Sequence, residues 1–278
     1  EHFEVGVECA VFRDEADLLD KVRYYLEHHD ERVAIALAGQ KRTLSQHLYS
    51  HRVRALLEKA AGMMRPLPVQ YARTKPHADI TAAVPQPDVV LDCGANVGQT
   101  AAMFRDWYPR AEIYSFEPVR GIFEKLRTRC GELNVHPVHK AVSDHDGSAT
   151  IHLTASPESN SLLGFQENSP CAKWHAVVGQ EQVETCTLDQ WCQDNGIAME
   201  RIDIIKMDLQ GGELMALKGA RRVLQHAKAV YVEVFFVPLY KDAPLFADID
   251  AFLVEGGFRR HAVYPSDQPH DWADVLYL

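Results

Sequence analysis

The sequence contains no pair of cysteines at CxxC spacing and no zinc-finger arrangement. Its six cysteines, at positions 9, 93, 130, 171, 186 and 192, are scattered through 278 residues, a length that can bury a core without disulfide staples. The 14 histidines include no HExxH pair, which argues against a zinc site of that kind. These absences favour reduced thiols, and we therefore expect a cytoplasmic protein.

Positive charge and long apolar runs are also scarce. Asp and Glu number 39 against 29 Lys and Arg, giving a net charge of -10, so we expect no nucleic-acid partner. The most apolar stretch, 230–239, contains Glu233 and is far shorter than the ~20 residues of a membrane-spanning helix, so we expect no membrane partner. The chain opens on Glu1 rather than Met, which fits either an artificial edge or a cut inside a longer polypeptide.

The N-terminal part is rich in helical patterns. Leu18, Val22 and Tyr25 recur at helical spacing after an acidic first turn, so residues 1–63 are predicted to form a small helical segment with a strand-like lead. Prolines then become frequent without any periodicity, and 64–87 is predicted to be a linker or an extended wrap. The main domain is expected at 88–278.

This main domain alternates strand-like and helix-like patterns. Such alternation is typical of an α/β fold, in which helices cover both faces of a parallel sheet. Strands are expected at 89–93, 112–117, 135–142, 202–209 and 229–236, and a turn with an additional hairpin after residue 142.

The first predicted strand runs into a glycine turn, VVLDCGANVGQT (89–100). In parallel sheets this turn is the usual ligand site. A dinucleotide fingerprint needs three glycines as GxGxxG, but Asn96 stands at the middle position, and Asp92 would repel a pyrophosphate by roughly 1 to 4 kcal/mol. A carboxylate beside the backbone donors of the turn suits the cationic, zwitterionic methionine end of S-adenosylmethionine better.

A second acidic residue, Glu117, ends the second predicted strand ~20 residues beyond the turn, where a carboxylate can accept hydrogen bonds from ribose hydroxyls. Enzymes that use NAD share this device, so Glu117 indicates a nucleoside without specifying a methyl donor. The alternative to a ligand site is purely structural. In that case Gly94 and Gly98 only permit a tight turn and helix packing, and Glu117 is a solvated residue at the end of a strand.

Several ordered motifs between residues 84 and 278 resemble the FkbM family of S-adenosylmethionine-dependent methyltransferases. They are LDCGANVGQT, FEP (116–118), AVSD (141–144), TLD (187–189) and IIKMDLQGGELMALKGA (204–220). The resemblance implies a Rossmann-like class I methyltransferase fold with a mostly parallel seven-stranded sheet. One departure is Gln210, where many members carry Glu, which argues against an essential base at that position.

The resemblance also implies a cofactor site. It places Asp92, Gly94, Ala95, Asn96 and Gly98 at the methionine end, Glu117 and Pro118 at the ribose, and Ala141, Val142 and Asp144 at the adenine. An ordinary polar turn accounts equally well for Asp144.

Residues 12–58 resemble the C-terminal tail of CgeB-like glycosyltransferases. This stretch is too short for a nucleotide-sugar site, so sugar transfer would belong to a domain upstream in a longer polypeptide. In this chain we favour a helical cap on the methyltransferase. A methyltransferase joined to a glycosyltransferase most plausibly methylates a sugar.

Three carboxylates are candidates for the chemistry. Asp208 ends the fourth predicted strand, Glu233 lies in the fifth, and Glu213 opens the helix between them, where a helix cap is its simpler role. We favour a metal-free general base, with Mg2+ held by a carboxylate pair as the alternative. Among the histidines, His139 and His175 lie in stretches that could approach the site, although a loop histidine is more often a surface residue.

The sequence therefore predicts an O-methyltransferase that uses S-adenosylmethionine and acts on a sugar, a glycan or a glycosylated small molecule. A non-catalytic cofactor-binding module that scaffolds a glycosyltransferase is the alternative, followed by an NAD-dependent oxidoreductase.

Overall fold

The computed structural model describes residues 3–48, 53, 69–165, 176–266 and 271–278. By their contacts these residues form two units, Glu1–Val69 and Gln70–Leu278.

The smaller unit contains two α-helices, α1 (Glu15–Glu27) and α2 (His29–Arg42), and a π-helical turn, η1 (Thr43–His47). Asp14 caps α1 by accepting a hydrogen bond from the backbone N–H of Asp17 at 2.9 Å. No residue of α1 or α2 is buried. The predicted strand-like lead is wrong, because the chain turns back at Gly6 and only an isolated bridge joins Val5 to Cys9.

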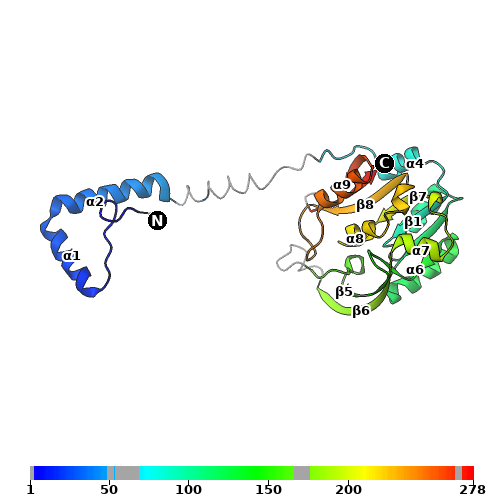
Figure 1. Cartoon of the computed structure of the whole chain (residues 1–278), viewed down its shortest axis with the longest axis horizontal. Coiled ribbons are helices and arrows are strands. Elements are labelled where there is room, and N and C mark those ends of the chain that lie inside the picture. Colours follow the sequence, from blue (N-terminus) through cyan, green and yellow to red (C-terminus); the bar gives the residue numbers. More distant parts are fainter. Residues whose placement is uncertain (1–2, 49–52, 54–68, 166–175, 267–270) are drawn as a thin grey trace. The chain divides into compact units, whose positions relative to one another are not determined.

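The larger unit is built on a seven-stranded sheet (Figure 1). The strand order is β3-β2-β1-β7-β8-β10-β9; β10 is antiparallel to both of its neighbours, and the other pairs are parallel. The strands are β1 (Val89–Cys93), β2 (Glu112–Phe116), β3 (His136–Val138), β7 (Ile202–Met207), β8 (Ala229–Phe235), β9 (Arg260–Pro265) and β10 (Trp272–Tyr277). Every residue of β1 and β7 is buried, as expected for central strands covered on both faces.

Helices cover both faces of this sheet. Ile80, Phe104 and Leu126, from three different helices, pack with Val90 and Ile113 of the sheet on one face. On the other face Trp191 packs edge-on against Phe116. The helices are α4 (Pro76–Ala83), α5 (Gln99–Trp107), α6 (Arg120–Leu133), α7 (Leu188–Asp194), α8 (Glu213–Lys218) and α9 (Phe246–Glu255), with short 3-10 turns at Pro157–Ser159 (η2), Met199–Arg201 (η4) and Val223–Gln225 (η5). The predicted α/β fold with a mostly parallel seven-stranded sheet and helices on both faces is thus confirmed.

A second, three-stranded sheet has the order β4-β6-β5. It comprises β4 (Ala141–Val142), β5 (Gly147–Thr154) and β6 (Val177–Cys186). The single strand predicted at 135–142 is therefore wrong: a turn closed by the N–H of Lys140 and the carbonyl of Val138 sends β3 into the large sheet and β4 into the small one.

Part of the predicted linker at 64–87 is helical. Pro76 occupies the first turn of α4, where a missing N–H costs nothing, and Ile80 is fully buried. The hydroxyl of Tyr264 donates to Asp79 at 2.6 Å and ties α4 to β9. The expectation of an irregular stretch fails here because proline at a helix start is compatible with helix.

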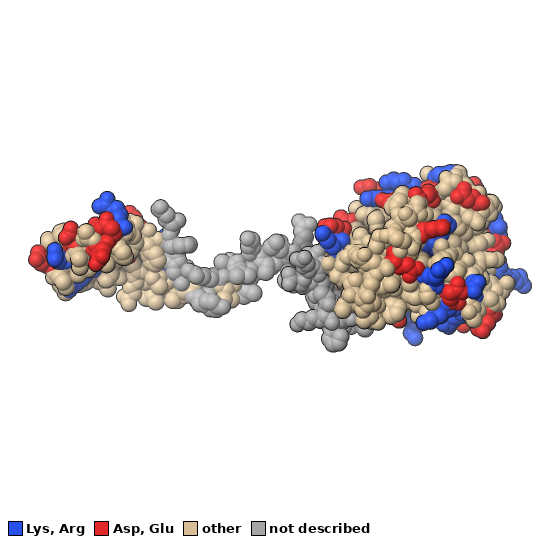
Figure 2. Space-filling view, turned by 90° about the horizontal axis from the view of Figure 1, so that it is seen from below, with Lys and Arg blue, Asp and Glu red and all other residues tan. Residues whose placement is uncertain are grey.

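Acidic and basic side chains are interspersed over the larger unit on the face shown in Figure 2. That face carries no continuous basic surface. Among the helices that the structure describes, none is both long and apolar enough to cross a membrane.

Candidate active site

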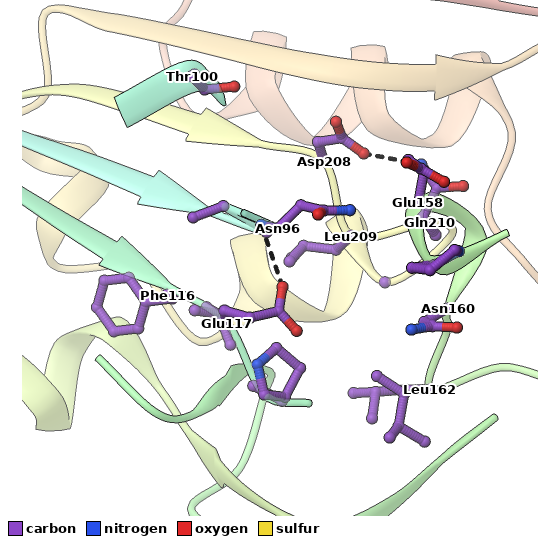
Figure 3. Close-up of a pocket in the computed structure, with 18 of the residues that line it drawn as sticks. Asn96, Thr100, Phe116, Glu117, Glu158, Asn160, Leu162, Asp208, Leu209 and Gln210 are labelled. Atoms are coloured by element: carbon purple, nitrogen blue, oxygen red, sulfur yellow. Dashed lines mark hydrogen bonds between the residues drawn. The ribbon is translucent and has the colours of Figure 1, made fainter. Parts of the chain in front are cut away.

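A cavity of about 270 Å³ lies at the carboxyl ends of β1, β2 and β7 (Figure 3). One side of this cavity is formed by the glycine turn and the end of β2, and the opposite side by η2 and the loop after β7. The residues that line the cavity include Ala95, Asn96, Thr100, Glu117, Pro118, Ala141, Val142, Glu158, Asn160, Lys206, Asp208 and Gln210.

The glycine turn is shaped by left-handed backbone. Gly94, Asn96 and Gly98 have φ values of 82°, 49° and 87°. A Cβ on Gly94 would lie 1.8 Å from the carbonyl oxygen of Asp208, so only glycine fits where β1 passes the end of β7. The turn and Asp208 are therefore held together by direct backbone contact.

The backbone donors of this turn are already engaged. The N–H groups of Gly94 and Ala95 donate to the carbonyl of Phe116, and that of Asn96 donates to Glu117 at 3.1 Å. The next two N–H groups bond within the turn, to the side chain of Asn96 and to the carbonyl of Ala95. The expectation that the turn itself offers free donors to a ligand carboxylate is corrected. Donors remain at the first turn of α5, whose residues Gln99 and Thr100 line the cavity.

Asp92 does not reach the cavity. It is fully buried; its Oδ2 accepts a hydrogen bond from Ser115 at 3.1 Å, and its Oδ1 lies 3.4 Å from Lys206 Nζ. Burial raises the pKa of Asp92, against the attraction of Lys206. The predicted direct contact with a ligand ammonium is replaced by a supporting role behind the turn.

Lys206 is a site residue that the sequence analysis missed. Its Nζ donates to the carbonyl of Gly94 at 2.9 Å and lies 3.4 Å from Asp92 and 3.5 Å from Asp208. Burial lowers the pKa of Lys206, but the two carboxylates outweigh it and hold the pKa above its usual value. A lone lysine inside the apolar strand IDIIKM was the available signal.

Ser115, Asp92 and Lys206 occupy matching positions on the neighbouring strands β2, β1 and β7. Side chains in register on parallel strands project from the same face of the sheet. These three residues form a polar row, which ends at Asp208 on the cavity surface.

Glu117 lines the cavity and is nearly buried. Burial raises its pKa to about 7, although the N–H groups of Val119 and Asn96 donate to its carboxylate. Pro118, Ala141 and Val142, which the family resemblance assigns to the ribose and the adenine, also line the cavity.

Asp144 lies outside this lining. It is exposed in the turn after β4, and its carboxylate is 2.8 Å from Nδ1 of His145. Its position agrees with the polar-turn interpretation.

The predicted carboxylates converge around Gln210. Asp208 lines the cavity, and its Oδ1 accepts a hydrogen bond from Gln210 Nε2 at 2.8 Å (Figure 3). The same nitrogen donates to Glu233 Oε2 at 2.9 Å. Glu233 is buried behind Gln210, and its burial together with the charge of Asp208 raises its pKa well above the usual range.

Glu213 has a structural role at this end of β7. Its Oε1 accepts hydrogen bonds from the N–H groups of Leu209 and Gly211, at 2.7 and 3.3 Å, and so fixes the loop that follows Asp208. Burial raises its pKa to about 7.

The histidine predictions have different outcomes. His175 lies outside the described residues. His139 stacks on Phe123 with ring centroids 4.3 Å apart and does not line the cavity. Within the described part of the chain, no group of three or more His, Cys, Asp or Glu side chains is placed to hold a metal ion.

Comparison with known proteins gives matches for both units. The family model "Methyltransferase FkbM domain" matches residues 92–260, and the model "Glycosyl transferase-like" matches residues 1–58. The chain is 30% identical over 205 residues to "2-O-methyltransferase NoeI" of Sinorhizobium fredii, covering 70% of this chain and 82% of that protein. It is 25% identical over 149 residues to "Hexuronic acid methyltransferase AglP" of Haloferax volcanii, covering 53% and 56%.

Among solved structures, the larger unit is similar to the crystal structure of a methyltransferase FkbM from Methylobacillus flagellatus. The identity is 18% and the TM-score 0.45, over 69% of this chain and 43% of that chain.

Proposed function

The chain belongs to the FkbM family of S-adenosylmethionine-dependent methyltransferases, and from this premise we propose that it methylates a hydroxyl of a sugar, a glycan or a glycosylated small molecule. The observation that carries the proposal is the placing of Asp208 in one cavity with the glycine turn and Glu117. A proton acceptor and a nucleoside site thus share one space.

The cavity fits S-adenosylmethionine by its chemistry. Glu117 accepts the ribose hydroxyls, and Pro118, Ala141 and Val142 supply an apolar surface for the adenine. At the methionine end the first-turn N–H groups of α5 and the hydroxyl of Thr100 receive the carboxylate. Asp92 and Lys206 hold Gly94 in place from behind.

On the acceptor side Asp208 is the proposed general base. When bound, S-adenosylmethionine supplies a methyl group activated by a positively charged sulfur. Asp208 would take the proton of the acceptor hydroxyl, which would leave the hydroxyl oxygen free to accept that methyl group. Gln210 donates to Oδ1 of Asp208, and Lys206 lies 3.5 Å from Oδ2, so each oxygen of the carboxylate has a partner that orients it. The alternative of Mg2+ held by a carboxylate pair is not favoured, because the Gln210 amide lies between Asp208 and Glu233.

Three observations support a sugar as the acceptor. The relatives NoeI and AglP carry names of a 2-O-methyltransferase and a hexuronic acid methyltransferase, and residues 1–58 match a glycosyltransferase-like family. The acceptor wall is also polar, with Glu158, Asn160 and Gln210 available to hydroxyl groups. A glycosyltransferase domain in the same longer polypeptide is part of this proposal. So is a cytoplasmic location, which fits the five described cysteines, all free thiols.

Two measurements test the function. Calorimetry should detect binding of S-adenosylmethionine, and a panel of neutral and acidic sugars incubated with labelled methyl donor should give a labelled ether. Asp208→Asn should lower kcat by roughly 100- to 10,000-fold and leave cofactor affinity within about twofold. Absence of cofactor binding by the parent protein would refute the cofactor site. Cofactor binding without transfer to any sugar, with no difference between parent and variant, would favour the scaffolding module.

A further inference from the structure

The side-chain amide of Gln210 separates two carboxylates that would otherwise face each other. Its Nε2 donates to Asp208 at 2.8 Å and to Glu233 at 2.9 Å. A primary amide nitrogen carries two hydrogens, so both are used, one on each carboxylate. Neither bond requires either carboxyl group to carry a proton.

The orientation of this amide is fixed by its other contacts. The hydroxyl of Tyr240 donates to Gln210 Oε1 at 2.5 Å, and the hydroxyl of Ser161 donates to the main-chain carbonyl at 2.6 Å. Gln210 has left-handed backbone, φ 54°, in the loop that Glu213 holds. An inverted amide would turn its oxygen toward two carboxylates, which is electrostatically unfavourable.

Gln210 also joins the acceptor wall to the base. The segment 161–165 meets the segment 237–243 through a hydrogen bond from the N–H of Lys241 to the carbonyl of Gly164 at 2.7 Å. Both segments contact the Gln210–Gly211 turn, because a Cβ on Gly211 would lie 3.2 to 3.3 Å from side chains of Leu163, Ala243 and Tyr240.

Acidic groups outnumber basic ones around Gln210. Asp208 directly follows β7, and Glu233 lies on β8 across the Gln210 amide. Glu213 opens α8 and holds the same loop, and Asp274 on β10 is paired with Glu233. Glu158 of η2 shares the cavity (Figure 3). Two lysines line the same cavity: Lys206, which is paired with Asp92 and Asp208, and Lys140, which is paired with Glu184. A carboxyl group at position 210 would keep its proton only up to a limited pH.

We propose that Gln210 is a positioning residue whose side-chain amide bridges Asp208 and Glu233 and so holds the Asp208 base in place. Because an amide does not ionise, this bridge keeps the acceptor and the base aligned at pH values at which a carboxyl group at position 210 would lose its proton. This inference rests on the proposed function. It explains how the residue contributes to the reaction without being a base.

Gln210→Glu tests the inference directly. At low pH the protonated Glu side chain is neutral and retains one donor, so its kcat should lie within about fivefold of the parent value. As the pH rises, this group ionises beside the Asp208 carboxylate and next to the buried Glu233, and the ratio of parent to variant kcat should grow by at least tenfold. KM for S-adenosylmethionine should stay within about twofold throughout. A constant ratio from pH 6 to 9 would overturn the proposal, because a purely structural defect lowers kcat equally at every pH.

Gln210→Leu provides a second test, which remains valid even if the Gln210→Glu protein unfolds at high pH. It removes both donors, so Asp208 loses a stabilising hydrogen bond and faces Glu233, and the acid limb of its kcat profile should move to higher pH. An unshifted limb would also overturn the proposal. Tyr240→Phe is the matched control: it keeps both donors, so its kcat loss should be pH-independent. If the parent protein transfers no methyl group, the proposed function fails instead.

Discussion

At the scale of single residues, Lys206 is the positively charged member of the polar row that it forms with Ser115 and Asp92. It is nearly buried between Asp92 and Asp208. Removing one member of such a group leaves a buried charge uncompensated. The row therefore sets both the stability of the fold and the shape of the glycine turn.

Lys206→Met should lower the free energy of unfolding by roughly 3 to 5 kcal/mol, because Asp92 stays buried without its counter-charge. Urea denaturation at pH 7 measures this change. The double variant with Asp92→Asn should recover a substantial part of the loss. Additive losses in the double variant would contradict a coupled pair.

Glu117 should make both stability and cofactor binding depend on pH. Its folded pKa of about 7 lies above the usual 4.5, so the folded protein holds a proton that the unfolded chain releases. Stability from this group is present below pH 4.5 and is lost as the pH rises to about 7, at a cost of about 3 kcal/mol.

Ribose hydroxyls donate hydrogen bonds and therefore favour the ionised form of Glu117. Affinity for S-adenosylmethionine should be roughly tenfold weaker at pH 6 than at pH 8, with proton release on binding. Calorimetry in two buffers of different ionisation enthalpy counts the protons. Glu117→Gln should abolish the release. Glu213→Gln should retain it, because Glu213 has a similar pKa but lies outside the cavity lining. Equal proton release by the parent and Glu117→Gln would contradict the ribose role.

At the scale of single elements, local patterns explain what could be predicted. The buried strand VVLDC, its glycine turn and the position of Glu117 follow from neighbouring residues. The burial of Asp92 does not, because it depends on the register that places Lys206 beside it, 114 residues away in the chain. The division between β3 and β4 likewise depends on the distant partner β6.

Helix α4 was missed because proline suggests irregular chain. Its Ile80 is fully buried, and Val84 directly after it is 2% exposed. A chain beginning at residue 70 should therefore unfold at the same temperature as the larger unit of the full chain. A chain beginning at 85 should lose at least ~3 kcal/mol, the cost of vacating such core positions. Differential scanning calorimetry compares the three chains. An unchanged transition for the shortest would show that α4 does not contribute to the core.

For the whole molecule, the sequence motifs were sufficient to identify the family over the larger unit and the glycosyltransferase-like stretch before it, and both matches are confirmed. The acceptor could not be predicted in the same way. The side of the cavity proposed for the acceptor is lined from 157–162 and from the loop after β7, and the segment 237–243 packs against that loop at Gly211. These stretches are distant in the chain and have no characteristic spacing.

The contact between Gly94 and the Asp208 carbonyl has an evolutionary consequence. The glycine turn and the proposed base Asp208 are joined through the sheet, whereas the proposed acceptor side is lined from η2 and from the loop after β7. The two sides of the cavity can therefore diverge separately. Substitutions in the acceptor-side loop should then redirect the same methyl donor to a new hydroxyl without changing the residues proposed for the reaction. Engineering of acceptor specificity should accordingly begin in these loops and keep Gly94 and Asp208 fixed.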